Sequence, residues 1–150
     1  MKCVSIRFGD PEVAPLLIDL HREYETRYGD GASVYDVNAV DFEPPHGGFL
    51  VLVDNGVTLA GGGVHRYDDT TAEVKRMWTN PDYRRQGHAR TIIRELEALA
   101  RGLGYEKMRL ETGYLQPEAI ALYSSLGYNN IGTYGIYENA SGFEVDLLAP

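Results

Sequence analysis

The chain has 150 residues, 43% of them hydrophobic, and a formal net charge of −8. This length predicts one domain over residues 1–150, with enough apolar residues for a core. The negative charge argues against a nucleic acid partner, because phosphate contacts need a basic surface. There is no run of about 18 apolar residues, so no membrane span and no membrane partner are expected.

The single cysteine, Cys3, excludes an intramolecular disulfide, and the N-terminal residues contain no apolar signal region. Both features favour a cytoplasmic location. The histidines do not follow the spacing of metal ligands, so the sequence predicts no metal site.

The first elements are a strand and a helix. Residues 3–8 alternate between polar and apolar side chains, which indicates a strand. Asp10 followed by Pro11 is typical of an N-cap and the first helical position, and apolar spacing continues that helix to Tyr28. Residues 32–47 are mixed, with a short helix as one option.

Three strands of an antiparallel meander follow. They are predicted over residues 49–53, 57–67 and 72–79. The first two are joined by Asn55-Gly56, a dipeptide suited to the positive φ angles of a tight hairpin turn.

The second half of the chain alternates helices with strands. In order, the predictions are a helix over 89–103, a strand over 107–112, a helix between Pro117 and Gly127, and two short strands around Tyr134 and Phe143. The order indicates a mixed α/β domain. The crossover helix makes the strands at 72–79 and 107–112 parallel neighbours.

The turn at residues 84–89, Arg-Arg-Gln-Gly-His-Ala, lies where the long helix begins. The first N–H groups of a helix have no intrahelical partner, and the macrodipole makes that end positive. Such an end binds phosphate, and Gly87 allows a ligand to approach the backbone closely. We interpret the turn as a pyrophosphate site. The alternative is an ordinary tight turn with two solvated arginines.

Two segments resemble the GNAT superfamily of acetyl-CoA-dependent N-acetyltransferases. Residues 84–89 are similar to its acetyl-CoA motif, Arg/Gln-x-x-Gly-x-Gly/Ala. Residues 117–128 are similar to its second signature, a helix that ends in Tyr-x-x-x-Gly-Phe/Tyr. A nicotinamide-dependent oxidoreductase would instead need a G-x-G-x-x-G unit, which is missing.

The resemblance implies a GNAT fold, a mixed sheet of six or seven strands flanked by about four helices, with splayed fourth and fifth strands. Acetyl-CoA would lie in the opening between these two strands. The residues that the resemblance assigns to acetyl-CoA are Met77, Trp78 and Thr79 on the fourth strand, Arg84, Arg85, Gln86, Gly87, His88 and Ala89 in the turn, and Gln116 and Tyr123 in the second signature.

Two carboxylates are candidates for the proton acceptor. An alkyl amine with a pKa of about 10.4 is protonated at neutral pH, so some group must take its proton. Glu73 is the first candidate, on a strand face that alternation assigns also to Lys75, Met77 and Thr79; a salt bridge with Lys75 is the alternative. Glu111 is the second candidate, and a structural role is its alternative.

Two further roles follow from the resemblance. Tyr123 corresponds to the family tyrosine that donates to the departing sulfur, and a buried core tyrosine is the alternative. The backbone N–H of Met77 or Trp78 corresponds to the donor that stabilises the tetrahedral oxyanion.

The acceptor is expected to be a primary amine of a small molecule or peptide. Five tyrosines lie in the segments where this family binds its acceptor, although ordinary packing explains most of them equally well: Tyr24, Tyr28, Tyr35, Tyr134 and Tyr137. A homodimer is left open. The competing class is a catalytically silent domain of the same fold that holds acyl-CoA as a sensor.

Overall fold

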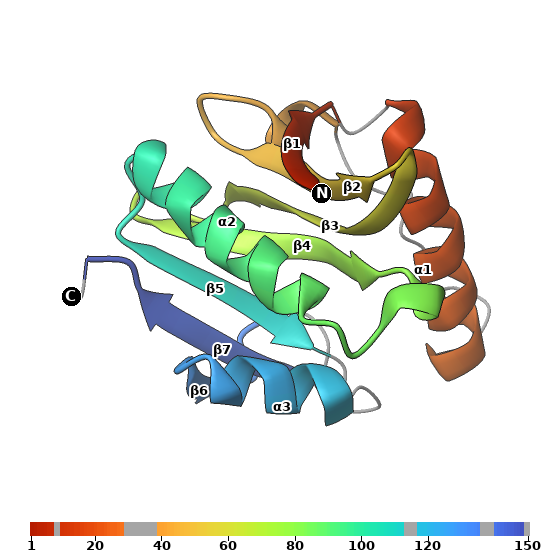
Figure 1. Cartoon of the computed structure of the whole chain (residues 1–150). Coiled ribbons are helices and arrows are strands. Elements are labelled where there is room, and N and C mark those ends of the chain that lie inside the picture. Colours follow the sequence, from red (N-terminus) through yellow and green to blue (C-terminus); the bar gives the residue numbers. More distant parts are fainter. Residues whose placement is uncertain (8–9, 29–38, 113–116, 136–139, 149–150) are drawn as a thin grey trace.

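The computed structural model describes residues 1–7, 10–28, 39–112, 117–135 and 140–148, without the side chains of residues 20, 23–28 and 39. Within these residues, seven strands form one mixed sheet in the order β1-β2-β3-β4-β5-β7-β6. Helices α2 and α3 lie in front of the sheet in Figure 1, and α1 stands at the right, beside the end of β4. The predicted mixed α/β fold is confirmed.

The described elements follow the expected order along the chain. They are β1 Lys2–Ile6, α1 Ala14–Tyr28, β2 Gly48–Asp54, β3 Val57–Arg66, β4 Thr71–Thr79, α2 His88–Gly102, β5 Lys107–Thr112, α3 Pro117–Ser125, β6 Asn129–Gly132 and β7 Ser141–Asp146. Three short 3-10 helices lie at Pro11–Val13, Ala39–Phe42 and Pro81–Tyr83.

Asp10 is the N-cap of the 3-10 helix that leads into α1, and Pro11 follows at its start, as expected. The Asp10 carboxylate bonds to no helical N–H and instead accepts the N–H of Arg7 at 2.9 Å. One expectation about an element boundary was wrong. The first tail strand ends before Tyr134, because Gly132 adopts a positive φ of 75° and its pairing with Gly142 is the last of the β6–β7 ladder.

The core consists of two apolar clusters on opposite faces of the sheet. The larger cluster packs α2 and α3 against one face and includes Ile92, Leu96 and Tyr123. The smaller cluster packs the start of α1 against the other face and includes Leu16 and Trp78. Burial of this apolar surface is the main force that holds the helices on the sheet.

A β-bulge in β4 separates the two halves of that strand. Gly63 pairs with Lys75 and Gly61 with Trp78, so β4 uses one more residue than β3 over the same length. The bulge contains Arg76, whose φ is 61°. Because a bulge reverses the alternation of side chains, Met77 packs into the α2 cluster. The predicted common face for Glu73, Lys75, Met77 and Thr79 is therefore wrong beyond Lys75.

Strands β4 and β5 pair only at their beginnings. Their parallel register runs from Thr71↔Lys107 to Glu73↔Arg109 and then stops, although both strands continue. On its other side β5 pairs with β7 along its whole length. Within the described residues, the β5-facing edge of β4 therefore has no partner strand from residue 74 to 79. The predicted splaying is present.

Candidate active site

The chain leaves β4 through a turn that is fastened to β3. The backbone N–H of Asn80 donates to the Leu59 carbonyl at 2.8 Å, and its side-chain amide donates to the Thr58 carbonyl at 3.2 Å. Its side-chain oxygen accepts the N–H of Asp82 at 3.0 Å. These bonds fix the direction in which the chain approaches α2.

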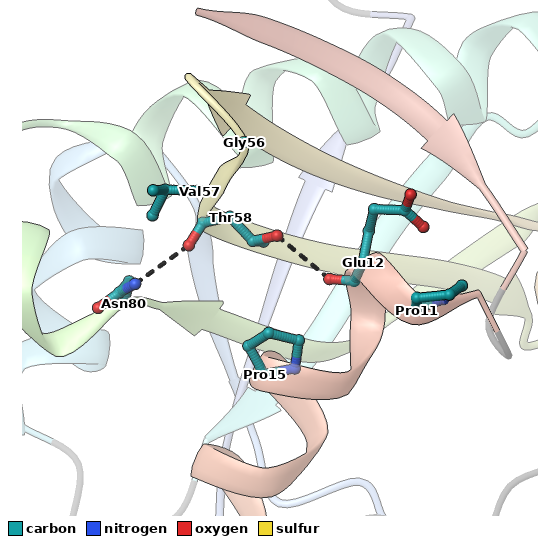
Figure 2. A pocket seen from close by; sticks show the side chains of 7 residues that line it. All are labelled: Pro11, Glu12, Pro15, Gly56, Val57, Thr58 and Asn80. Carbon is teal, nitrogen blue, oxygen red and sulfur yellow. Dashed lines mark hydrogen bonds between the residues drawn. The ribbon is translucent and has the colours of Figure 1, made fainter.

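An open depression of about 430 Å³ lies beside Asn80 and is shown in Figure 2. It is lined by Pro11, Glu12, Pro15, Gly56, Val57, Thr58 and Asn80. The Thr58 hydroxyl donates to the Glu12 carbonyl at 3.2 Å, which ties β3 to the start of the first helical segment. Because the depression lies at the far end of β3 from Glu73, we assign it a structural role.

Gly87 forms the N-cap of α2 in the left-handed conformation, with a φ of 83°. The first helical bond runs from the Thr91 N–H to the Gly87 carbonyl at 3.1 Å, so the amides before Thr91 have no intrahelical acceptor. A Cβ added at Gly87 would meet no atom within 4 Å. A helix end with free amides and a positive dipole is the kind of site that binds an anion.

The side chains around Gly87 differ in exposure. Arg84, Arg85 and Gln86 are exposed, and Arg85 has a positive φ of 64°. His88 is buried, and its Nε2 has no hydrogen-bond partner among the described residues. Ala89 is half-buried at the start of the helix. The two arginines can therefore reach an anion, whereas His88 offers its backbone N–H.

The last residues of β4 present backbone rather than side chain to the opening. Trp78 is buried, and its indole N–H donates to the Asp19 carboxylate at 2.6 Å. The sulfur of Met77 occupies space that a Cβ at Gly62 would enter, at 2.5 Å. With these side chains packed away, the unpaired edge of Met77, Trp78 and Thr79 is available to an extended ligand.

Glu73 is buried at the point where β4 and β5 separate, and three side chains contact its carboxylate. His65 contacts Oε1 at 2.8 Å, Lys75 lies 3.5 Å from the same oxygen, and the Tyr134 hydroxyl donates to Oε2 at 2.5 Å. Burial alone would raise the pKa of Glu73, but the bonds from His65 and Tyr134 and the Lys75 charge hold that pKa below its usual value. The salt bridge between Glu73 and Lys75, which was the alternative to a role of Glu73 as proton acceptor, is therefore present.

Glu111 lies two residues beyond the last β4–β5 pair, on β5. Its Oε2 is buried without a hydrogen-bond partner among the described residues. Burial raises the pKa of Glu111, the Lys75 charge lowers it, the Glu73 charge raises it, and the net shift is upward. A Cβ at Gly135 would lie 2.5 Å from Oε2, so this glycine leaves the room that the carboxylate occupies.

Arg109 crosses the same face next to Glu111. Its guanidinium is bonded to Glu144, with Nε at 2.9 Å from the carboxylate, and lies over the rings of Tyr67 and Tyr134 at 4.6 and 4.9 Å. Burial alone would lower the pKa of Arg109, but Glu144 raises it above its usual value. Arg109 is therefore a fixed cation that holds Tyr134 over Glu73.

Tyr123 lies on the opposite side of the sheet, in the cluster beneath α2 and α3. It is 4% exposed, and its ring lies 5.9 Å from that of Tyr128 and 6.0 Å from that of Phe143. Glu73 and Glu111 face away from this cluster. The candidate groups thus lie on both faces of the sheet.

Some predicted site residues fall outside the described part of the chain. These are Gln116, Tyr35 and Tyr137, together with the side chains of Tyr24 and Tyr28. Sequence reasoning named Tyr134 as an acceptor-segment tyrosine but did not place His65, Tyr134 or Gly135 in the charged cluster. His65 could have been found, because the β3–β4 hairpin register places it opposite Glu73. Tyr134 and Gly135 reach the cluster only through the tertiary fold.

Comparison with known proteins defines the class. Residues 14–128 match the acetyltransferase (GNAT) family, and the chain belongs to that family. The chain is similar to the uncharacterized N-acetyltransferase YjgM of Escherichia coli K12, with 27% identity over 129 residues, 81% of this chain and 77% of that one. Human N-acetyltransferase 8 is 37% identical over 70 residues, 43% of this chain, and the match spans only 31% of the human protein.

Solved structures share the whole fold. A protein of Klebsiella pneumoniae assigned as an acyl-CoA N-acyltransferase superposes with a TM-score of 0.81 at 25% identity, over 98% of this chain and 97% of that one. An aminoglycoside 6'-N-acetyltransferase complexed with coenzyme A superposes with a TM-score of 0.75 at 14% identity, over 100% and 99% of the two chains.

None of the described helices combines the length and the apolar character that a membrane crossing needs. Among the same residues, no group of three or more His, Cys, Asp or Glu side chains is arranged to hold a metal ion.

Proposed function

We propose that the protein is an N-acetyltransferase that moves the acetyl group of acetyl-CoA to a primary amine of a small molecule or peptide. The observation that carries the proposal is the pairing of two features: the Gly87 turn that begins α2, and the unpaired edge of β4 that leads to it. One provides amides for a diphosphate. The other provides backbone groups for an extended pantetheine arm.

The turn would hold the nucleotide end of the donor. Backbone N–H groups from Arg85 to Ala89 would bond to the diphosphate, and the exposed Arg84 and Arg85 side chains would pair with phosphate oxygens. The open space above Gly87 supports this assignment. Because the amides are fixed by α2, they lose little freedom when the ligand binds.

The edge of β4 would orient the thioester. Backbone groups of Met77, Trp78 and Thr79 would bond to the pantetheine arm, and Gln116 of the second signature would be a further contact. The backbone N–H of Met77 or Trp78 would donate to the oxyanion that forms at the thioester carbonyl. Substitution of these side chains would leave that donor in place.

Glu111 is the better supported proton acceptor. Its raised pKa and unpartnered Oε2 suit a base that takes the amine proton as the C–N bond forms. The three contacts on Glu73 lower its basicity, so we assign Glu73 to holding Tyr134, His65 and Lys75 in place. The C–S bond then breaks, and the Tyr123 hydroxyl would donate to the departing thiolate.

The test is a thiol-release assay combined with thermal shift. Acetyl-CoA and coenzyme A should raise Tm, whereas NAD should not. Thiol should then be released from acetyl-CoA in the presence of at least one member of a panel of amines, which includes amino acids, polyamines, aminoglycosides and peptides. Stabilisation by NAD alone would overturn the proposal. Stabilisation by acetyl-CoA without turnover of any amine would favour the silent sensor.

A further inference from the structure

Helix α2 carries a buried carboxylate outside the site described so far. Glu97 is only 3% exposed. Arg94 donates to both of its oxygens at 3.0 Å, and Arg101 lies 3.9 Å away. The hydroxyl of Tyr128, a residue that follows α3, donates to Oε2 of Glu97 at 2.7 Å. The carboxylate therefore joins α2 to the segment after α3.

Tyr128 is in turn connected to Tyr123 by a backbone hydrogen bond and by a contact between their rings. Gly127 ends α3 at a φ of 87°, the Tyr128 N–H donates to the Tyr123 carbonyl at 3.1 Å, and the Gly127 N–H donates to the Ser124 carbonyl at 3.2 Å. This pattern is a Schellman motif, in which the residues that correspond to Tyr123 and Tyr128 commonly contact each other. Here their rings lie 5.9 Å apart.

The same side of α2 makes further bonds to the end of α3. Arg94 donates to the Leu126 carbonyl at 3.3 Å, and Arg90 to the Ser125 hydroxyl at 3.4 Å. Positions 90, 94 and 97 are spaced by four and three residues, so they form one stripe along the helix. Figure 1 shows α2 and α3 in front of the same sheet. The stripe fixes the end of α3 to the helix that begins at Gly87.

We infer that Glu97 is a positioning residue: through the Tyr128 hydroxyl it holds the Tyr123 ring at a fixed place relative to the Gly87 turn. The inference rests on the proposed function, in which one end of acetyl-CoA lies at the turn and its sulfur lies at Tyr123. A donor held at both points needs a constant separation between them. Small displacements of a reacting group lower the rate far more than they lower binding.

The Tyr128 hydroxyl is suited to this task. Burial and the hydrogen bond to Glu97 raise the pKa of Tyr128, so the hydroxyl remains protonated and continues to donate at any working pH. Tyr105 offers a matched comparison, because it is also a buried tyrosine of the same cluster, and its hydroxyl donates to the His46 carbonyl at 2.6 Å. That bond is remote from α3.

The experiment compares Tyr128→Phe with Tyr105→Phe, since each removes one buried hydroxyl and keeps the ring. Tyr128→Phe should lower kcat about three- to tenfold with KM for acetyl-CoA unchanged, whereas Tyr105→Phe should leave kcat within about twofold. Added to Tyr123→Phe, the Tyr128→Phe change should have no further effect on kcat, because coupled residues are not additive.

Glu97→Asp supplies a second variant that keeps the charge next to Arg94 but withdraws it from Tyr128. Glu97→Asp should also lower kcat while KM for acetyl-CoA stays unchanged. If Tyr128→Phe does not fold, Glu97→Asp alone tests the positioning role. An unchanged kcat in the variant that folds, or equal losses with and without the Tyr123 hydroxyl, would overturn the positioning role. If the wild-type protein releases no thiol at all, the proposed function fails instead.

Discussion

The turn at residues 84–87 and the charged cluster where β4 and β5 separate differ in how the chain builds them. The turn is contiguous in sequence, and its conformation follows from Gly87 and the helix after it. The cluster draws Glu73, Glu111 and Tyr134 from three separate segments. A binding surface of backbone amides can thus be local, whereas a group with a shifted pKa depends on neighbours that only folding supplies.

The strongest test of the turn is Gly87→Glu. A side chain at this positive φ is strained, and a carboxylate there would occupy the open space and repel phosphates. Affinity for acetyl-CoA, measured by titration calorimetry, should fall at least about a hundredfold. Gly102→Glu adds the same charge at the exposed far end of α2 and should bind normally. Retained affinity in Gly87→Glu would place the diphosphate elsewhere.

Within the cluster, Glu111→Gln should have the largest effect on turnover. Loss of a general base lowers kcat by about 10²–10⁴-fold. The raised pKa means that the folded state disfavours ionised Glu111. The stability that Glu111 contributes is therefore complete at a pH below its pKa in the unfolded chain. This stability is lost as the pH rises through its pKa in the folded protein. At pH 8 the variant should therefore be at least as stable as the wild type while being nearly inactive.

The pH profile of kcat checks the same assignment. The wild type should lose activity on the acid side at a pH above the ordinary glutamate value of 4.5, and Glu111→Gln should lack this limb. If Glu73→Gln removed the limb and Glu111→Gln did not, the two carboxylates would exchange roles.

Tyr123→Phe tests the opposite face of the sheet. Loss of the hydroxyl that donates to the departing sulfur should lower kcat by one to three orders of magnitude, roughly the range of general-acid catalysis. The ring remains in the core with Tyr128 and Phe143, so the variant should still fold. An unchanged kcat would remove the hydroxyl from the mechanism and leave Tyr123 as a packing residue.

Glu73→Gln should act mainly on stability. The lowered pKa of Glu73 means that its ionised form stabilises the fold. This stabilisation is complete above the unfolded value of 4.5 and is lost as pH falls through the lower folded value. The variant should lose about 1–3 kcal/mol of unfolding free energy at pH 7. In denaturant titrations, the difference in unfolding free energy between the wild type and the variant should become smaller below pH 4.5. A difference that does not change with pH would contradict this role for ionised Glu73.

The elements that the sequence predicted well are those with a strong local pattern. Apolar spacing located α2, and the Asn55-Gly56 dipeptide located a hairpin in which both residues adopt the expected positive φ. The mixed α/β fold followed from these patterns, whereas the acetyltransferase family followed from the resemblance of residues 84–89 and 117–128 to its two signatures. Local sterics and hydrogen bonding are sufficient to determine such features.

Nonlocal contacts decided what the sequence could not. The bulge in β4 moved Met77 to the other face, because it arises from the register with β3. Glu97 belongs to the polar side of α2 by spacing, yet it is buried and bonded to Tyr128. The sequence offered Glu73 as the first proton acceptor and Glu111 as the second, without showing what surrounds either carboxylate. Only the neighbours that surround each carboxylate lower one pKa and raise the other, because desolvation and charge act across the assembled fold rather than along the chain.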